Sequence, residues 1–399
     1  MEKLYYKDQY IREFTAKIIE VKEINDTYHI ALDKTAFFPG VGGQPCDLGY
    51  LDGKIVIDVY EKNGMVYHVV EEEISTIKYI KGEIDWSRRE DGMHQHLAQH
   101  VLSGCFFKLF NSNTVSIHLG KDISTVDIIG HLNEDQIRKA EKMANDVIRE
   151  NILVESIAPS KNELESMNLR RDLPNTEEEI RVVRIGDLDI NACCGIHPRR
   201  TLDLKLIKIK KYEKNKNNTR IEFLAGERAI QDSLYKDRII RDICNYLSSN
   251  EEEALNSIKN LKSNIEDLLD EKKKLDEELM NYEIEYILSN SSKEDDLIII
   301  KKIFKERSSD YIRKLANKLS EEGNIISLFA IKNNDKANII FSCSKNIEDI
   351  NMGEVLKESI KEINGKGGGS KVLAQGSGES INIEKYLNNV YNKIKENII

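Results

Sequence analysis

The chain has 399 residues, of which 40 % are hydrophobic and 32 % are charged, and its net charge is −10. This length leaves room for two or three domains that each bury a core, and no apolar run approaches the roughly 18 residues that a membrane helix needs. The first residues do not form a secretory signal, and the six cysteines are scattered apart from one adjacent pair. These features argue against a membrane protein and against a disulfide-stabilised secreted domain, and they predict a cytoplasmic protein.

Residues 1–85 are predicted to form a β-rich N-terminal subdomain. Residues 55–60 and 65–70 are rich in β-branched and aromatic side chains, which favour strands. The turn signal Asn63-Gly64 lies between them. The pattern therefore predicts a β-hairpin.

A glycine-rich segment at residues 35–45 precedes this hairpin and is a candidate floor for a substrate. Gly42 and Gly43 permit a ligand to approach the backbone closely. Thr35 offers a hydroxyl and Gln44 offers an amide. A tight turn between strands, without a ligand, is the alternative.

Residues 86–230 are predicted to form an α+β domain. Asp91 is expected to cap a helix over residues 94–110, and a second helix is expected over residues 134–150. A capping box at residues 160–163 indicates a third, shorter helix. Strands are expected between these helices and near the end of the domain.

Two pairs of metal-binding residues with the same spacing lie in this domain. His96 and His100, in the sequence HLAQH, lie on one face of the predicted helix. Cys193 and His197, in CCGIH, repeat the spacing in a glycine-containing loop. Three imidazoles and one thiolate are typical ligands of tetrahedral zinc. Cys194 is an alternative ligand, because the sequence does not say which sulfur faces inward.

The residue after His96 argues against one class of zinc enzyme, the zinc proteases. In the zinc-protease motif H-E-x-x-H this position holds the glutamate that activates water. Leu97 stands there in this chain. The sequence therefore predicts a metal site without the general base of a protease.

Residues 231–292 are predicted to form two helices, the second with a heptad pattern. Its apolar residues recur at steps of three and four between Ile258 and Tyr282, with Lys272 at one seam position. The pattern predicts either a two-chain coiled coil or a helical hairpin that packs on its own chain. A homodimer through the coiled coil or the C-terminal domain is expected.

Residues 293–399 alternate apolar strands with helices and are predicted to form a small α/β domain. A glycine-rich stretch, residues 364–378, is expected to be a loop. It lacks the spacing of a Walker or dinucleotide motif. The candidates for contact with an RNA backbone are Lys366, Gly367, Gly368, Gly369 and Lys371.

Positive charge is concentrated in one part of this acidic chain. Residues 199–220 contain nine Lys or Arg and two acids, a local charge of +7. Such a segment is expected to bind phosphates, with Lys208, Lys210 and Lys211 as candidates for tRNA contact. A solvated hairpin is the alternative.

Taken together, the motifs resemble those of the free-standing alanyl-tRNA editing proteins, in the long form with a C-terminal DHHA1 domain. TAFFPGVGGQP is similar to the family's T-x-F-Y-P-x-x-G-G-Q, HLAQH to its H-x-x-x-H, and CCGIH to its C-G-G-T-H. RIEFLAGERA resembles the end of the editing domain of alanyl-tRNA synthetase, and GKGGGSKVLAQGSG resembles the glycine-rich signature of DHHA1. Cys194 and Ile196 depart from the usual glycine and threonine of the family.

The resemblance implies an aminoacyl-tRNA hydrolase with an α+β editing core. Its substrate would be tRNA(Ala) mischarged with serine or glycine, acted on in trans. Zn²⁺ would be held by His96, His100, Cys193 and His197, and Thr35 is the candidate contact for the seryl hydroxyl. A non-catalytic tRNA-binding protein with structural zinc and a coiled-coil dimer is the alternative.

Overall fold

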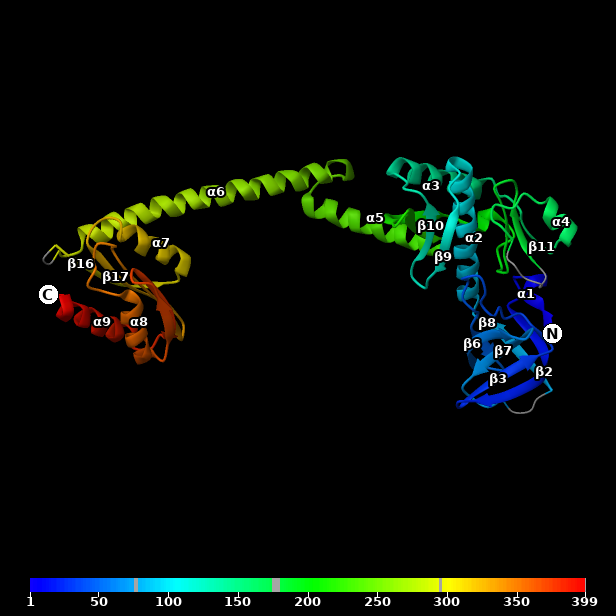
Figure 1. Cartoon of the computed structure of the whole chain (residues 1–399), viewed down its shortest axis with the longest axis horizontal. Helices are drawn as coiled ribbons and strands as arrows, with labels where there is room; N and C mark the ends of the chain where they lie inside the picture. The colour runs from blue at the N-terminus through cyan, green and yellow to red at the C-terminus, as the bar shows by residue number, and fades with distance from the viewer. Residues whose placement is uncertain (75–77, 174–179, 294–295, 399) are drawn as a thin grey trace. The chain divides into compact units, whose positions relative to one another are not determined.

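The computed structural model describes residues 1–74, 78–173, 180–293 and 296–398. The chain divides into two units, Met1–Glu251 and Glu252–Ile399, and Figure 1 shows their helices and strands. The predicted α+β class is confirmed. The finer division into four parts, with boundaries near residues 85, 230 and 292, stays a prediction. Among the described residues, no helix is long and apolar enough to cross a membrane.

The first unit begins with a closed barrel whose strands follow the order β2-β3-β7-β6-β5-β8. The predicted hairpin is confirmed, because β6 and β7 pair antiparallel. Asn63 and Gly64 between them both have positive φ, as a two-residue hairpin turn requires. A short helix α1 and the two-residue strands β1 and β4 lie outside the barrel. The elements of this part are β1 (Glu2–Lys3), α1 (Leu4–Lys7), β2 (Glu13–Ile24), β3 (Thr27–Leu32), β4 (Lys34–Thr35), β5 (Gly49–Leu51), β6 (Lys54–Lys62), β7 (Met65–Val70) and β8 (Tyr79–Ile84).

A fully buried histidine, His68 on β7, lies among the barrel strands. Its Nδ1–H donates to the carbonyl oxygen of Ile30 at 2.9 Å, which leaves Nε2 to accept from the hydroxyl of Thr35 at 2.8 Å. Burial lowers the pKa of His68 to about 4. The folded barrel therefore keeps this histidine neutral.

We expect His68 to make the first unit less stable in acid. The histidine of an unfolded chain takes up a proton near pH 6.5, whereas the folded pKa is about 4. The free energy of unfolding should therefore fall as the pH drops from 6.5 to 4, by up to about 1.4 kcal/mol per pH unit. His68→Asn takes up no proton, and its denaturant unfolding, followed by the fluorescence of the single tryptophan, Trp86, should have a smaller slope with pH. Equal slopes for the two proteins would contradict this role.

Helix α2 is the centre of the rest of the first unit. Every residue from Gly92 to Phe106 is buried, which is typical of a helix surrounded by protein on all sides. Its apolar side chains share a core with α3 and with two antiparallel sheets, β14-β15-β10-β9 and β11-β12-β13. The elements of this part are α2 (Trp86–Phe110), β9 (Thr114–Leu119), β10 (Ser124–Ile129), α3 (Glu134–Arg149), β11 (Val154–Ile157), α4 (Lys161–Ser166), β12 (Val182–Ile185), β13 (Asp189–Ala192), η1 (Thr201–Leu204), β14 (Ile207–Asn215), β15 (Asn218–Ala225) and α5 (Glu227–Leu247).

The prediction that Asp91 caps α2 is wrong. The N-cap is Asp85, whose side chain accepts a hydrogen bond from the backbone amide of Arg88. Asp91 lies inside the helix, where it accepts from Gln95 and pairs with Arg228. The helix begins earlier because Asp85 follows strand β8 directly and satisfies a free amide of the first turn.

The second unit contains a five-stranded sheet in the order β16-β17-β18-β20-β19. Helices α8 and α9 pack in one hydrophobic cluster, and α7 and the end of α6 pack in another. The heptad residues of α6 are exposed; Leu268, for example, retains 63 % of its accessible surface. The coiled coil itself stays a prediction. The elements are α6 (Glu251–Ser289), β16 (Ile298–Lys305), α7 (Ser309–Leu319), β17 (Ile325–Asn333), β18 (Lys336–Cys343), α8 (Met352–Ser359), η2 (Ile360–Ile363), β19 (Lys366–Gly369), β20 (Leu373–Glu379) and α9 (Ile383–Ile398).

The glycine-rich stretch at residues 364–378 is not the predicted loop. It forms the antiparallel strands β19 and β20 at the edge of the sheet. A Cβ on Gly369 would lie 2.2 Å from the carbonyl oxygen of Leu373, and one on Gly376 would lie 2.3 Å from the side chain of Ile360. Glycine is used there because neighbouring groups approach the backbone too closely for a side chain.

Candidate metal centre

Helix α2 carries the first pair of candidate ligands. His96 and His100 are both buried, at 1 % and 3 % exposure. Their ring centroids lie 5.1 Å apart, as expected for side chains one helical turn apart. The intervening Leu97 is fully buried in the hydrophobic core. The helix therefore supplies two imidazoles and no general base at position 97.

The segment after β13 brings the second pair to the first. Cys193 Sγ lies 3.4 Å from His96 Nε2 and 3.6 Å from His197 Nε2. One ligand atom from each of the four side chains lies within 4.8 Å of every other. Cys194 is exposed and does not belong to this cluster. Of the two adjacent sulfurs, Cys193 is the one that faces the histidines.

Both candidate ligands on α2, His96 and His100, are held by a partner on the outer nitrogen of the ring. Gln44 Oε1 lies 3.0 Å from His96 Nδ1, and Asp189 Oδ2 lies 2.9 Å from His100 Nδ1. Asp189 is itself held by Arg170 at 2.6 Å. A hydrogen bond at Nδ1 leaves Nε2 as the ligand atom, so these contacts orient both rings toward Cys193.

The four side chains fit a tetrahedral metal ion. Metal–nitrogen and metal–sulfur bonds of ordinary zinc length, at tetrahedral angles, separate a sulfur and a nitrogen ligand by about 3.6 Å, close to the two observed distances. His100 Nε2 and His197 Nδ1 are buried polar atoms without a hydrogen-bond partner among the described residues. Unpaired buried nitrogens are rare, and a metal ion would satisfy the one on His100.

The electrostatics of the cluster also favour a cation. Burial raises the pKa of the Cys193 thiol, but the surrounding imidazoles outweigh this and hold the pKa well below its usual value. Burial likewise lowers the pKa of His100, yet the Cys193 sulfur and Asp189 raise it to about 9. The cluster therefore attracts positive charge, and a metal ion can take the place of a proton there.

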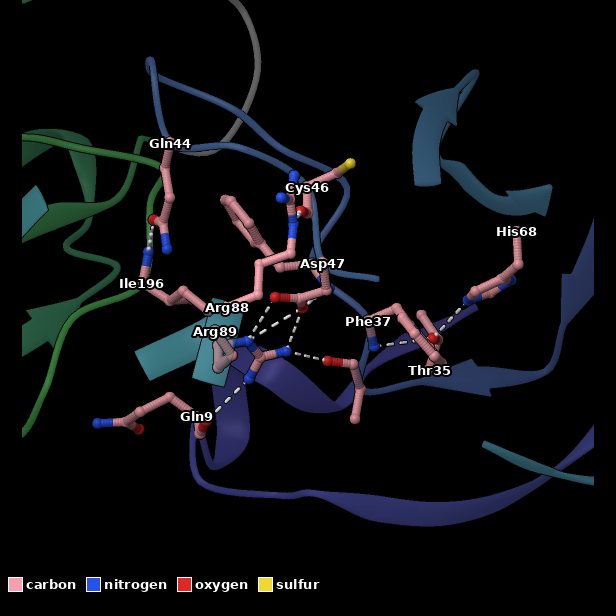
Figure 2. A network of polar contacts seen from close by, with 12 residues as sticks. Gln9, Thr35, Phe37, Gln44, Cys46, Asp47, His68, Arg88, Arg89 and Ile196 are labelled. Atoms are coloured by element: carbon pink, nitrogen blue, oxygen red, sulfur yellow. Dashed lines mark hydrogen bonds and ion pairs between the residues drawn. The ribbon is translucent and has the colours of Figure 1, made fainter. Parts of the chain in front are cut away.

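The glycine-rich segment braces this centre through Gln44. Besides His96, Gln44 Oε1 accepts from the backbone amide of Ile196 at 3.0 Å (Figure 2). Gln44 thus joins the segment to both ligand motifs. Gly43 has a φ of +87°, a backbone conformation that residues other than glycine rarely adopt, so the sharp turn before Gln44 favours glycine.

Thr35 lies elsewhere. It is fully buried, and its hydroxyl donates to His68 and accepts from the amide of Phe37. Figure 2 shows Thr35 and Gln44 on opposite sides of the buried ion pair between Arg89 and Asp47. The predicted contact between Thr35 and a seryl group is therefore not supported by its position.

A cavity of about 280 Å³ opens beside the metal centre. It includes three of the four candidate ligands and, of the predicted loop residues, Gly42. None of the described residues that line it is an aspartate or glutamate. The cavity is therefore suited to a small substrate held at the centre, but it supplies no carboxylate base. Its lining residues are Val41, Gly42, His96, Gln99, His100, Ile117, Arg171, Ile180, Arg181, Asn191, Ala192, Cys193 and Cys194.

Comparison with known proteins identifies the family. The family described as "Threonyl and Alanyl tRNA synthetase second additional domain" matches residues 180–222, which include Cys193 and His197, and the DHHA1 domain matches residues 295–396. The alanyl-tRNA editing protein AlaX-L of Pyrococcus horikoshii is 31 % identical over 400 residues, covering 95 % of each chain. The chain belongs to the alanyl-tRNA editing protein family.

Other relatives match this chain along most of its length. The alanyl-tRNA editing protein Aarsd1 of Mus musculus is 28 % identical, covering 94 % of this chain and 93 % of its own. The alanine–tRNA ligase of Methanobrevibacter smithii is 28 % identical, covering 96 % of this chain but 45 % of the ligase. This chain thus corresponds to less than half of the ligase.

The three lysines of β14 that were predicted to contact tRNA are each paired with an acid. The local charge of +7 along residues 199–220 is therefore partly neutralised by Glu141 and Asp232 from elsewhere in the chain, and the predicted phosphate track is weaker than the sequence indicates. The ion pairs are Lys208–Glu141, Lys210–Asp232 and Lys211–Glu213. The glycine-rich candidates of the second unit are exposed; they are Lys366, Gly367, Gly368, Gly369 and Lys371.

Sequence reasoning missed the residues that hold the ligands. Asp189 lies four residues before Cys193, on the same face of β13 and its continuation, and this alternation could have identified it. Nothing in the sequence indicates that Arg170 would pair with Asp189. The role of Gln44 was predicted as a substrate contact, whereas its observed contacts are with His96 and Ile196.

We expect Gln44→Met to weaken metal binding without unfolding the chain. The substitution keeps the length of the side chain but removes the acceptor that holds both His96 and the amide of Ile196. Loss of such an outer contact typically lowers metal affinity 10- to 100-fold. Competition with a chromophoric chelator measures the affinity, and Gln231→Met, on the exposed side of α5, is the matched control. An unchanged affinity for Gln44→Met would show that the contact does not orient His96.

Proposed function

We propose that the protein hydrolyses the ester bond of tRNA(Ala) mischarged with serine or glycine, acting in trans in the cytoplasm and depending on Zn²⁺. The observation that carries the proposal is the cluster of His96, His100, Cys193 and His197 at the wall of a small cavity, in a chain of the alanyl-tRNA editing family. The enzyme class would be an aminoacyl-tRNA hydrolase, a carboxylic ester hydrolase.

A physical argument explains the need for such a reaction. A synthetic site that accepts alanine cannot exclude the smaller glycine by size, and it rejects an added hydroxyl poorly. A second, hydrolytic site with different contacts can remove the wrong products. A cavity of about 280 Å³ suits an amino acid attached to the end of a tRNA.

The residues around the metal centre would have different roles. His96, His100, Cys193 and His197 would hold the zinc ion, which when bound supplies a Lewis acid for the substrate's amino group or for water. Gln44 and Asp189 keep the two α2 imidazoles in place. Gly42 and Gly43 would let the substrate approach the backbone of the cavity floor, which Gln44 braces.

No carboxylate among the described residues that line the cavity can act as a general base. Leu97 is buried, and the lining contains no carboxylate. A hydroxyl of the terminal ribose of the tRNA would take part in orienting the water. This reading predicts that the enzyme needs its substrate to complete the site.

Contacts with the rest of the tRNA would come from both units. The exposed backbone and lysines of β19 and the turn after it, namely Lys366, Gly367, Gly368, Gly369 and Lys371, are suited to contact phosphates. Lys208, Lys210 and Lys211 would contribute after exchanging their carboxylate partners. We further propose a homodimer through the exposed heptad face of α6 or through the C-terminal domain.

A deacylation assay tests the function. Purified chain is mixed with Ser-tRNA(Ala), Gly-tRNA(Ala) and Ala-tRNA(Ala), and release of the amino acid is followed with the zinc-loaded and the chelated protein. We expect release from the seryl or glycyl substrate by the loaded protein alone, with the alanyl substrate spared. Tight tRNA binding without release of any amino acid would instead support a non-catalytic tRNA-binding protein with a structural metal.

A further inference from the structure

Two polar side chains of strand β13, and the cysteine that directly follows the strand, belong to the surroundings of the metal centre. Successive side chains of a strand point to opposite faces, so every second residue shares a face. Asp189 and Asn191 therefore share a face of β13, and Cys193 is the first residue after the strand. Asp189 holds His100, and Cys193 is a candidate ligand. Asn191 lies between them and has no part in the centre itself.

The carboxamide of Asn191 has no hydrogen-bond partner among the described residues. The residue is 7 % exposed and lines the 280 Å³ cavity, yet its side chain makes no hydrogen bond with any described residue. Its atoms are also absent from the fully enclosed, unpaired polar atoms, so they face the open space of the cavity. A buried amide kept free in this way is expected to have a partner from outside the chain.

The second carboxamide of the cavity is already in use. Gln99 Nε2 donates to the hydroxyl oxygen of Ser103 at 2.8 Å, and Ser103 also accepts from Thr114 at 2.7 Å. Gln99 is therefore fixed at one end by its own helix. Among the described lining residues, Asn191 has the one carboxamide in which neither the oxygen nor the nitrogen makes a hydrogen bond.

We infer that Asn191 binds the side-chain hydroxyl of the seryl ester and determines the preference for serine over alanine. The inference rests on the proposed function. A hydroxyl both donates and accepts, so a carboxamide can pair with it through its oxygen or its nitrogen. With alanine in the cavity, the carboxamide would stay buried and unpaired. A site built in this way rejects a substrate that lacks the hydroxyl far better than an apolar pocket rejects an added one.

The position of Thr35 favours Asn191 as this contact. The Thr35 hydroxyl is fully buried and bonded to His68 and to the amide of Phe37, and Thr35 does not line the cavity. Thr35→Val should therefore keep the seryl preference. Asn191→Leu should remove it, because leucine has the same branched shape and no polar group.

Binding of stable analogues tests the inference apart from catalysis. The probes are 3′-deoxyadenosine carrying serine or alanine through a 3′-amide, which is not an ester and resists hydrolysis, and calorimetry on the zinc-loaded protein gives the dissociation constants. We expect wild type to prefer the seryl probe and Asn191→Leu to lose about tenfold in affinity for it, with the alanyl probe and the metal content unchanged. Asn162→Leu, on the exposed surface of α4, is the matched control, and Asn191→Ala should repeat the result if the leucine variant does not fold.

Two results would overturn the inference. Equal weakening of both probes would show that Asn191 binds a group that they share, such as the ribose hydroxyl or the amino group. An unchanged seryl preference would remove Asn191 from recognition. Failure of the proposed function is a separate result, since wild type would then release no serine from Ser-tRNA(Ala) whatever the probes show.

Discussion

Replacing His100 with alanine is expected to abolish both metal binding and release of serine from Ser-tRNA(Ala). His100 supplies a buried imidazole nitrogen that has no partner among the described residues, and its removal leaves three of the four candidate ligands. Loss of an outer contact alone lowers affinity or activity 10- to 100-fold, so loss of a ligand should exceed about 100-fold. Cys193→Ala should have the same effect. Metal content by mass spectrometry, measured beside the deacylation rate, checks both variants.

The adjacent thiol provides a sharp control for this prediction. Cys194 is exposed and lies outside the cluster, whereas Cys193 lies 3.4 Å from His96 Nε2. Cys194→Ala should therefore keep its metal while Cys193→Ala loses it. Loss of metal from Cys194→Ala with retention in Cys193→Ala would mean that the other sulfur is the ligand.

The largest loss of stability is expected from Arg89→Ala. Arg89 is 1 % exposed and lies on the first turns of α2. Its guanidinium pairs with Asp47 and donates to the backbone carbonyls of Gln9 and Ala36. Truncation leaves the buried Asp47 carboxylate without its counter-ion, with the amide of Phe38 as its remaining donor, and removes the donor from two carbonyls. Breaking a buried ion pair in this way typically lowers the free energy of unfolding by about 3–5 kcal/mol. Denaturant unfolding followed by Trp86 fluorescence reports on this unit.

A paired control separates the buried ion pair from charge in general. Arg138→Ala removes an arginine from the exposed pair with Glu134 on α3 and should change the free energy of unfolding by less than about 1 kcal/mol. The double variant with Arg89→Met and Asp47→Asn should lose less free energy of unfolding than its two single variants lose together, because neither charge is left alone. Additive losses, or an Arg89→Ala variant as stable as wild type, would show that the pair does not hold α2 to the barrel.

The sequence predicted the features that depend on local spacing. The pairing of His96 with His100 follows from helix geometry, and the hairpin of β6 and β7 follows from its turn residues. The four candidate ligands could be named because each pair is separated by one helical turn or its equivalent. The family resemblance placed the two pairs in one site, which spacing alone does not do.

The predictions that failed concern contacts between residues far apart in the chain. The lysines of β14 seemed free when counted along the sequence, but Glu141 of α3 and Asp232 of α5 reach them in space. The glycines of β19 seemed to mark a loop, yet Gly367 and Gly369 pack against β20 too closely for side chains. The hydroxyl of Thr35 could not be known to pair with His68, since the two residues are 33 positions apart in the chain.

Zinc reconstitution tests the central claim most directly. Chelated, metal-free protein is titrated with Zn²⁺ while the rate of serine release from Ser-tRNA(Ala) and the bound metal are measured together. The account predicts no release without metal, a rate that rises in proportion to bound zinc and a plateau at one ion per chain, with no response in His100→Ala. Undiminished release by the fully metal-free protein would contradict it.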